Sequence, residues 1–181
     1  MRQLDSNHRL FVELLGCTQS DTSTYPINPY DTMTPEQQAR YSRQIKLPQV
    51  GETGQERLLQ SRALIIGMGG LGSPVSMYLA AAGVGHLVLT DYDQVDASNL
   101  QRQIVHTQAN IGELKATSAR ETLLQLNPEV SILALDYELD GDELIAQAER
   151  ADVLVDCTDN FPSRFELNRV SLTTGTPLVS G

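Results

Sequence analysis

Cysteine is scarce in this sequence. Among its 181 residues only Cys17 and Cys157 occur, far apart, and no Cys-x-x-Cys pair is present. A disulfide framework is therefore excluded as the basis of the fold, and no zinc ligands are expected. A low cysteine content is typical of proteins from reducing compartments. We therefore expect a cytoplasmic protein.

Positive charge and long apolar runs are also lacking. The chain has 13 Lys and Arg against 23 Asp and Glu, a net charge of −10, which argues against nucleic acid as a partner. Its longest apolar runs are too short to cross a bilayer, and Asp5, Arg9 and Glu13 interrupt any secretory signal near the N-terminus. We therefore expect neither a nucleic acid nor a membrane partner.

Two regions of different composition are present. Residues 1–31 predict a poorly ordered extension, because 18–31 are rich in Ser, Thr, Asp, Asn and Pro. Residues 32–181 predict one domain. Its first helix is expected at Thr34, with Thr34 as N-cap and Gln37 closing a capping box, and it is expected to carry Tyr41 and Arg43.

From Ala63 onward the pattern alternates between strands and helices. A loop at 51–54 and a short helix at 55–60 lead to strands expected at 63–66, 87–90, 130–135, 153–155 and 177–180. Helices are expected from the N-cap Ser73 to Gly83, and at 112–126, 142–149 and 161–173. This alternation predicts the α/β class, with a doubly wound, mostly parallel, Rossmann-like sheet, truncated after its fifth strand.

A glycine-rich turn follows the first expected strand. Gly67, Gly69, Gly70 and Gly72 form a G-x-G-x-x-G pattern between that strand and a helix, and Asp91 ends the next strand. Glycines let phosphate approach the helix N-terminus, and an acid in this position reaches a ribose. A tight turn that binds nothing would leave Asp91 unexplained. The pattern therefore predicts a nucleotide site, but it suits NAD and ATP equally.

Charged residues near the expected strand ends favour a triphosphate. Arg43, Arg102 and Lys115 would supply the cations that phosphates need, although each could be an ordinary surface charge. Asp159 either caps the following helix or is an oxygen ligand for Mg²⁺. No histidine stands near Cys157 to activate it, so we expect an inert thiol; His8, His86 and His106 show no metal-ligand spacing.

Five ordered motifs together carry a resemblance to a known family: Arg40–Ile45, Gly67–Gly72, Ser98–Gln103, Lys115 and Asp156–Asn160. The chain resembles the N-terminal part of the adenylyltransferases that activate ubiquitin-like sulfur carriers in the molybdopterin and thiamine pathways, including HesA-like proteins and related to ubiquitin-activating enzymes. The resemblance implies that residues 32–181 form an ATP-binding adenylation domain. ATP and the carrier's C-terminal glycine carboxylate would give an acyl-adenylate and pyrophosphate.

The resemblance also implies residue roles. Arg43, Arg102, Lys115 and Asp159 would be catalytic, with Asp159 holding Mg²⁺ and Arg43 acting on the ATP of the partner in a homodimer. The nucleotide would be bound by Gly67, Gly69, Gly70, Gly72, Asp91, Ser98, Asn99, Leu100, Gln101, Arg102, Lys115, Asp159 and Asn160. The family's structural Zn²⁺ is not supported, because its paired Cys-x-x-Cys motifs belong to a later part.

Two other functions stay open. The chain could be a fragment of an NAD-dependent oxidoreductase, in which Arg102 and Lys115 would be surface residues. It could also be a non-catalytic module that dimerises with a longer relative. Because the sequence stops at Gly181, on a strand end where more of the site would be built, impaired activity is expected of the chain.

Overall fold

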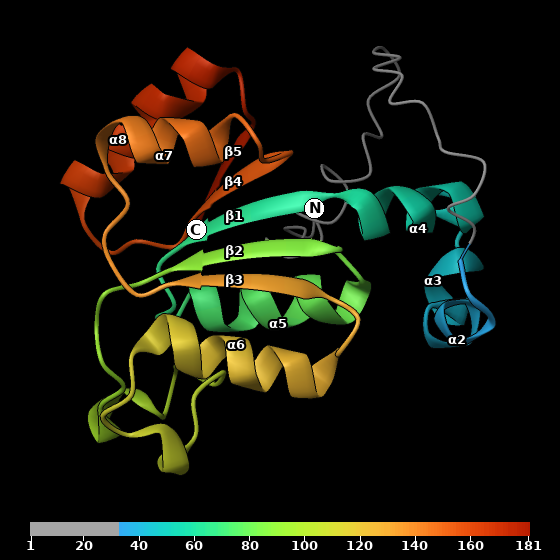
Figure 1. Cartoon of the computed structure of the whole chain (residues 1–181), viewed down its shortest axis with the longest axis horizontal. Coiled ribbons are helices and arrows are strands. Elements are labelled where there is room, and N and C mark those ends of the chain that lie inside the picture. Colours follow the sequence, from blue (N-terminus) through green and yellow to red (C-terminus); the bar gives the residue numbers. More distant parts are fainter. Residues whose placement is uncertain (1–32) are drawn as a thin grey trace, which may run out of the picture.

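A five-stranded parallel sheet forms the centre of the domain (Figure 1). The computed structural model describes residues 33–181, so the expected extension at 1–31 lies outside the described residues. In chain order the strands are β1 (Arg62–Ile66), β2 (His86–Thr90), β3 (Ser131–Leu135), β4 (Val153–Asp156) and β5 (Leu178–Ser180). All four neighbouring pairs are parallel, and their spatial order is β3-β2-β1-β4-β5.

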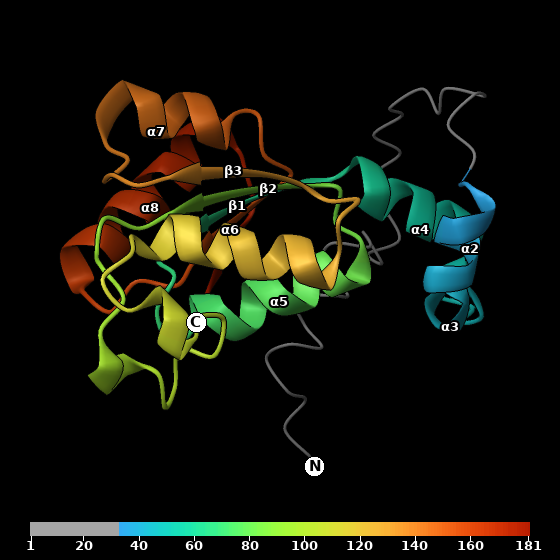
Figure 2. The same ribbon diagram turned by 60° about the horizontal axis from the view of Figure 1, so that its bottom comes forward.

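Helices cover both faces of the sheet, as Figure 2 shows from a second direction. On one face lie α5 (Gly72–Ala82) and α6 (Lys115–Leu126), and on the other lie α7 (Gly141–Ala148) and α8 (Phe161–Thr174). Each face has its own apolar core: Leu79 and Leu123 belong to the first, Leu144 and Leu167 to the second. The predicted α/β class and doubly wound parallel sheet are confirmed.

The strand order reverses beside β1. The chain moves from β1 through β2 to β3 on one side, then crosses to β4 and β5 on the other. The loops that leave β1 and β4 therefore diverge, because the helices after them go to opposite faces. Ligands of open parallel sheets bind in the crevice that such a reversal creates at the carboxyl ends of the strands.

Two of the expected helix starts are wrong. Residues 51–54 are not a loop but the first turn of α4 (Gly51–Gln60). Ser73 does not cap α5, because that helix already begins at Gly72 and the buried Ser73 hydroxyl has no hydrogen-bond partner among residues 33–181. Proline at the third helical position is still compatible with the helix, since the N–H groups of the first turn have no intrahelical partner.

The other elements differ from expectation by small shifts. The capping box of Thr34 and Gln37 is confirmed, but α2 (Pro35–Arg40) ends before Tyr41, and Arg43 lies on a separate helix, α3 (Ser42–Ile45). The helix expected from residue 112 begins at Lys115. Two short 3₁₀ helices, η1 (Ala97–Asn99) and η2 (Gln108–Asn110), occupy the long connection between β2 and α6.

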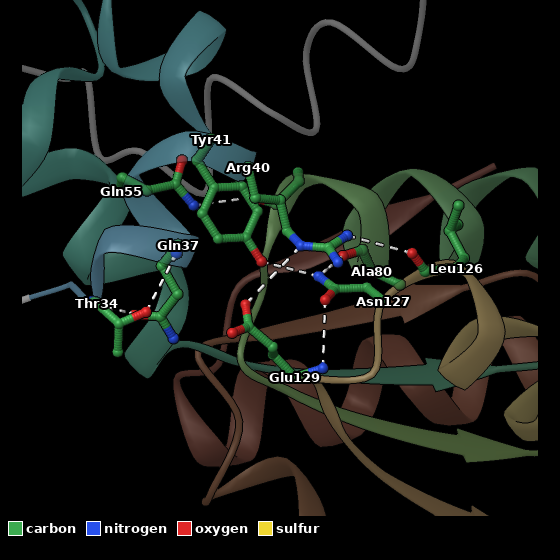
Figure 3. Close-up of polar contacts among 10 residues, drawn as sticks. Thr34, Gln37, Arg40, Tyr41, Gln55, Ala80, Leu126, Asn127 and Glu129 are labelled. Carbon is green, nitrogen blue, oxygen red and sulfur yellow. Dashed lines mark hydrogen bonds and ion pairs between the residues drawn. The ribbon is translucent and has the colours of Figure 1, made fainter.

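A buried tyrosine anchors the first helices to the domain (Figure 3). The Tyr41 hydroxyl accepts a hydrogen bond of 2.8 Å from Nδ2 of Asn127, which also donates to the Ala80 carbonyl at 2.8 Å. Gly83 ends α5 with φ of 84°, and a Cβ there would lie 2.5 Å from the Tyr41 ring. Only glycine meets both the backbone and the packing requirement at this position.

Two glutamines complete this anchor. Nε2 of Gln44 donates to Oε1 of Gln55 at 2.7 Å, and both glutamines donate to the Ala82 carbonyl at 3.0 Å. These bonds satisfy the carbonyl groups at the end of α5, which no intrahelical partner can reach. We call Tyr41, Gln44, Gln55 and Asn127 the amino-edge cluster, because α2, α3 and α4 lie at the end of the sheet where the strands begin (Figure 1).

Candidate nucleotide site

A cavity of about 700 Å³ opens at the carboxyl ends of β1, β2 and β4, where the strand order reverses. Eight of the predicted site residues line it: Gly67, Gly69, Gly70, Asp91, Arg102, Lys115, Asp159 and Asn160. The remaining predicted residues are not part of the lining: Arg43, Gly72, Ser98, Asn99, Leu100 and Gln101. The volume suits a ligand of nucleotide size.

The glycines of the turn have two different roles. A Cβ on Gly67, whose φ is 95°, would lie 2.8 Å from the Cys157 carbonyl oxygen, and one on Gly72 would lie 1.8 Å from the Gly67 carbonyl oxygen. Those two positions therefore require glycine, because the backbone of the turn packs there directly against other backbone atoms. Gly69 and Gly70 instead face the cavity, where a Cβ would meet only side-chain atoms at 3.5 Å or more. They leave the backbone N–H groups of the turn open to a ligand.

Asp91 connects the turn to the end of β2. Its Oδ2 accepts a hydrogen bond of 2.7 Å from the Met68 N–H, and its Oδ1 accepts one of 2.9 Å from the Asp93 N–H. A carboxylate has about four acceptor sites, so vicinal hydroxyl groups of a ribose can still be bound. Asp91 is half-buried in the cavity lining, unlike a solvated turn acid.

Two cations line the cavity. The side chain of Arg102 lies beside Gly70, its Cγ 3.5 Å from the position of a Cβ there, and its Nη1 donates to the Ser98 carbonyl at 3.4 Å. Lys115 opens α6 and is almost fully buried, with Nζ 2.7 Å from Oδ2 of Asp93. The Asp93 carboxylate is itself 57% exposed, so it can turn to water when another anion takes the lysine.

Of the two acids at the end of β4, one has a structural role and the other lines the cavity. Asp156 is buried, and its carboxylate accepts hydrogen bonds from Thr158 and from the Ser180 hydroxyl, which ties β4 to β5. The N-cap of α8 is Asn160, which accepts from the Ser163 N–H at 3.0 Å. The capping alternative for Asp159 is therefore wrong, and its exposed carboxylate faces the cavity.

This donor set fits nucleotide-bound Mg²⁺. Mg²⁺ is usually held by one or two carboxylates together with phosphate oxygens and water, so one exposed carboxylate is sufficient. Within residues 33–181, no three His, Cys, Asp or Glu side chains gather into a group that could hold a metal without such a ligand. Asp159 would therefore hold the ion only jointly with phosphate.

Cys157 lines the cavity but cannot act as a nucleophile. Burial, followed by the negative charge of Asp156, raises its pKa to about 12. At neutral pH the thiol stays protonated, and the thiolate is the reactive form. The predicted inertness of Cys157 is thus supported by its surroundings.

His106 has a role that the sequence did not indicate. Its Nε2 lies 3.0 Å from the Met68 carbonyl oxygen and its Nδ1 lies 2.9 Å from the Ser118 hydroxyl. Because a carbonyl only accepts, Nε2 carries the proton and Nδ1 accepts from Ser118. Burial lowers the His106 pKa, which keeps the ring neutral. The ring therefore ties the glycine-rich turn to α6.

Arg43 lies away from this cavity. It is exposed on α3, next to the amino-edge cluster, whereas the cavity is at the opposite end of the strands. The predicted grouping of Arg43 with Arg102 and Lys115 is therefore not found within residues 33–181 of one chain. Its action on a partner's nucleotide stays a prediction.

The described residues contain no helix whose length and apolar character would suit a membrane crossing. What they do contain is a reversal of strand order, a glycine-rich turn, an acid at the end of β2 and two cations around one cavity. The fold is of the doubly wound α/β class, and this combination is typical of its nucleotide-binding members.

Within that class, the chain belongs to the ThiF family, which it matches over residues 41–181. It is 49% identical over 141 residues to the sulfur carrier protein ThiS adenylyltransferase of Escherichia coli K12, covering 78% of this chain and 56% of the relative. It is 46% identical over 149 residues to the molybdopterin-synthase adenylyltransferase of the same strain, covering 82% and 60%. The chain thus spans little more than half of each relative.

A solved structure shares the fold. The ATP complex of the E. coli tRNA N6-threonylcarbamoyladenosine dehydratase TcdA superimposes with a TM-score of 0.73 at 26% identity, covering 81% of this chain and 60% of that one. The neighbour with the same fold thus binds ATP, which agrees with the predicted family and nucleotide.

Proposed function

We propose that this chain is the nucleotide-binding part of an adenylyltransferase that activates the C-terminal glycine carboxylate of a ubiquitin-like sulfur carrier. The observation that carries the proposal is the placement of Arg102 beside the glycine-rich turn, with Lys115 and Asp159 lining the same cavity. A dinucleotide needs little beyond the turn, whereas a triphosphate and its metal need cations and a carboxylate. Relatives named as adenylyltransferases of sulfur carriers support this choice.

The reaction follows from the placement of these groups. The carrier's carboxylate oxygen attacks the α-phosphorus of ATP, a P–O bond to the β-phosphate breaks, and pyrophosphate leaves with an acyl-adenylate as the other product. The N–H groups of the glycine-rich turn, Arg102 and Lys115 bind phosphate oxygens and offset the charge of the transition state. Asp91 accepts hydrogen bonds from the ribose hydroxyls. Mg²⁺, held by Asp159, would supply further charge neutralisation on the phosphates.

No protein nucleophile is needed for this step. The attacking oxygen belongs to the carrier and is already ionised at neutral pH, so catalysis requires placement and charge neutralisation. The protonated thiol of Cys157 is compatible with that chemistry.

A homodimer is part of the proposal. Arg43 is exposed and the helix that carries it is fixed by the amino-edge cluster, so it can be presented to the cavity of a second copy. In such a dimer each cavity would gain a third cation from the partner. We propose the cytoplasm as the compartment, in keeping with two cysteines that form no Cys-x-x-Cys pair.

Carrier-dependent exchange of labelled pyrophosphate into ATP tests this function. We expect exchange with a molybdopterin-type or thiamine-type carrier and none with the same carrier lacking its terminal glycine. Arg102→Ala and Asp159→Ala should abolish exchange, whereas Arg120→Ala should not, because Arg120 is exposed on α6 outside the cavity lining. A folded chain that shows no exchange with either carrier would refute catalysis by this chain.

Two ligand measurements separate the alternatives. An NAD-dependent oxidoreductase fragment requires NADH to bind with a change in nicotinamide fluorescence and to compete with Mg-ATP. A non-catalytic module requires that the chain bind Mg-ATP without exchange and change the activity or mass of a full-length homologue on mixing. Binding of Mg-ATP together with carrier-dependent exchange supports adenylation over both.

A further inference from the structure

A buried histidine holds the peptide group between Met68 and Gly69 in the glycine-rich turn. Nε2 of His106 donates to the Met68 carbonyl oxygen at 3.0 Å, and Nδ1 accepts from the Ser118 hydroxyl at 2.9 Å. His106 is 5% exposed, Met68 and Ser118 are fully buried, and none of the three lines the nucleotide cavity. The ring therefore lies behind the turn, and it can affect a bound nucleotide only through the groups that it holds.

Both peptide groups of Met68 are fixed by side chains. The Met68 N–H donates to Oδ2 of Asp91 at 2.7 Å, and the Met68 carbonyl accepts from His106. The next residue is glycine, and rotation of the 68–69 peptide would bring its φ to positive values, which glycine adopts at little cost. Steric hindrance thus does not fix the orientation of this peptide, so the hydrogen bond from His106 is what holds it.

The orientation of this peptide decides where the Gly69 N–H points. All peptide bonds of the described residues are trans, and in a planar trans peptide the C=O and the N–H point in opposite directions. Because the Met68 carbonyl points at the buried ring, the Gly69 N–H points away from it, and Gly69 lines the cavity. That N–H donates to no backbone carbonyl within residues 33–181, so it is available to a ligand.

We propose that His106 is a positioning residue for the nucleotide: by holding the Met68 carbonyl, it directs the Gly69 N–H at a phosphate oxygen. The inference rests on the proposed function in taking ATP as that nucleotide. Burial lowers the His106 pKa, so the ring is neutral and contributes an orientation rather than a charge. An N–H group that is already oriented binds phosphate without the loss of freedom that a rotating peptide would suffer.

The test compares two amide side chains of different reach. In His106→Gln the amide nitrogen takes approximately the place of Nε2 and can still donate to the Met68 carbonyl. In His106→Asn the shorter amide takes approximately the place of Nδ1, so it keeps a bond to Ser118 and loses the one to Met68. His86→Asn is the matched control, because His86 is exposed at the start of β2 and lies outside the cavity lining.

Calorimetric titrations with Mg-ATP and with adenosine separate phosphate binding from nucleoside binding, and thermal unfolding reports the fold. His106→Asn should weaken Mg-ATP binding about three- to tenfold, because a hydrogen bond to a charged group loses its direction, and should change adenosine affinity less than about twofold. His106→Gln and His86→Asn should bind both ligands within about twofold of the unsubstituted chain. Should His106→Asn fail to fold, His106→Leu takes its place, since leucine also lacks a donor and fills the buried space.

Three results would overturn the inference. Equal losses for Mg-ATP and adenosine would make His106 a packing residue. Unchanged Mg-ATP affinity in folded His106→Asn, or an equal loss in His106→Gln, would show that the bond to Met68 does not orient the turn. Each of these leaves the proposed function standing, because the unsubstituted chain still binds ATP. If the unsubstituted chain binds no Mg-ATP, the inference and the proposed function fail together.

Discussion

The two ends of the sheet treat their polar side chains differently. At the amino end, Tyr41, Gln44, Gln55 and Asn127 bond to each other and to the last carbonyls of α5. At the carboxyl end, Oε1 of Gln103 has no partner within the part of the chain that the structure describes, and Lys115 is paired with an exposed carboxylate that can be exchanged. Polar groups that satisfy each other stabilise a fold, whereas groups left open are available to a ligand.

The largest effect should come from a carboxyl-end residue with a purely structural role. In Gly72→Ala the new Cβ would lie 1.8 Å from the Gly67 carbonyl oxygen, so the turn must deform. We expect the free energy of unfolding to fall by about 3 kcal/mol or more and Mg-ATP binding to be lost. Chemical denaturation and calorimetry measure both. Gly112→Ala is the control: its φ of 89° is strained but its surroundings are open, so about 1–2 kcal/mol should be lost.

Next in size is the amino-end substitution Asn127→Ala. It removes donors to the Tyr41 hydroxyl and the Ala80 carbonyl and leaves both buried. We expect a loss of about 2–4 kcal/mol in unfolding free energy, with the Mg-ATP affinity of the folded protein unchanged. Tyr41→Phe should cost less, because Asn127 keeps its bond to Ala80. A change in nucleotide affinity in Asn127→Ala would contradict the separation of the two ends.

Arg102→Ala should show the converse pattern. The Arg102 side chain is exposed beside Gly70, so its removal should shift the melting temperature by no more than about 2 °C. A charge-assisted bond to phosphate is worth about 1.5–3 kcal/mol, so Mg-ATP affinity should fall about ten- to hundredfold. Calorimetry at two salt concentrations measures this loss. Equal affinity in the variant and the unsubstituted chain would remove Arg102 from the phosphate site.

The smallest effect concerns pH. The native pKa of His106 is lowered by burial, with Lys115 acting in the same direction and the Met68 carbonyl and Asp91 opposing. Below about pH 6.5 the unfolded chain therefore binds the proton more readily than the folded one, and stability falls as pH is lowered further. His106→Gln should flatten this dependence between about pH 7.5 and 5.5, measured by urea unfolding. The exposed His86 is the control, and a slope that responds equally to His86→Gln would contradict this assignment.

Much of the fold could be predicted from the sequence because its signals are local. Apolar runs followed by turn residues located all five strands to within one residue at each end. The errors arose where one residue type has two uses. Two glycines, Gly51 and Gly54, predict a loop, but Gly51 is the first residue of α4, with φ of 59°. Ser73 before Pro74 has the pattern of an N-cap, but α5 already begins at Gly72. That residue must be glycine because it packs directly against the Gly67 carbonyl.

The site was predictable as far as parallel topology brings residues together. Asp91 and Asp159 follow different strands, and both line the cavity because the carboxyl ends of parallel strands meet at one edge. The role of His106 was not predicted, because it depends on what lies beside the ring: a carbonyl and a hydroxyl, each supplied by another part of the chain. Spacing along the sequence carries no trace of those neighbours.

The pairing of Lys115 with Asp93 has a consequence for how the cavity fills. Before a nucleotide binds, Lys115 is already paired with Asp93. Its buried ammonium group is therefore not left as an unpaired charge. An entering phosphate exchanges one anion for another, and the released carboxylate returns to water at little cost because it is largely solvated already. Asp93 thus pairs with Lys115 while the cavity is empty and competes only weakly with an incoming phosphate for the ammonium group.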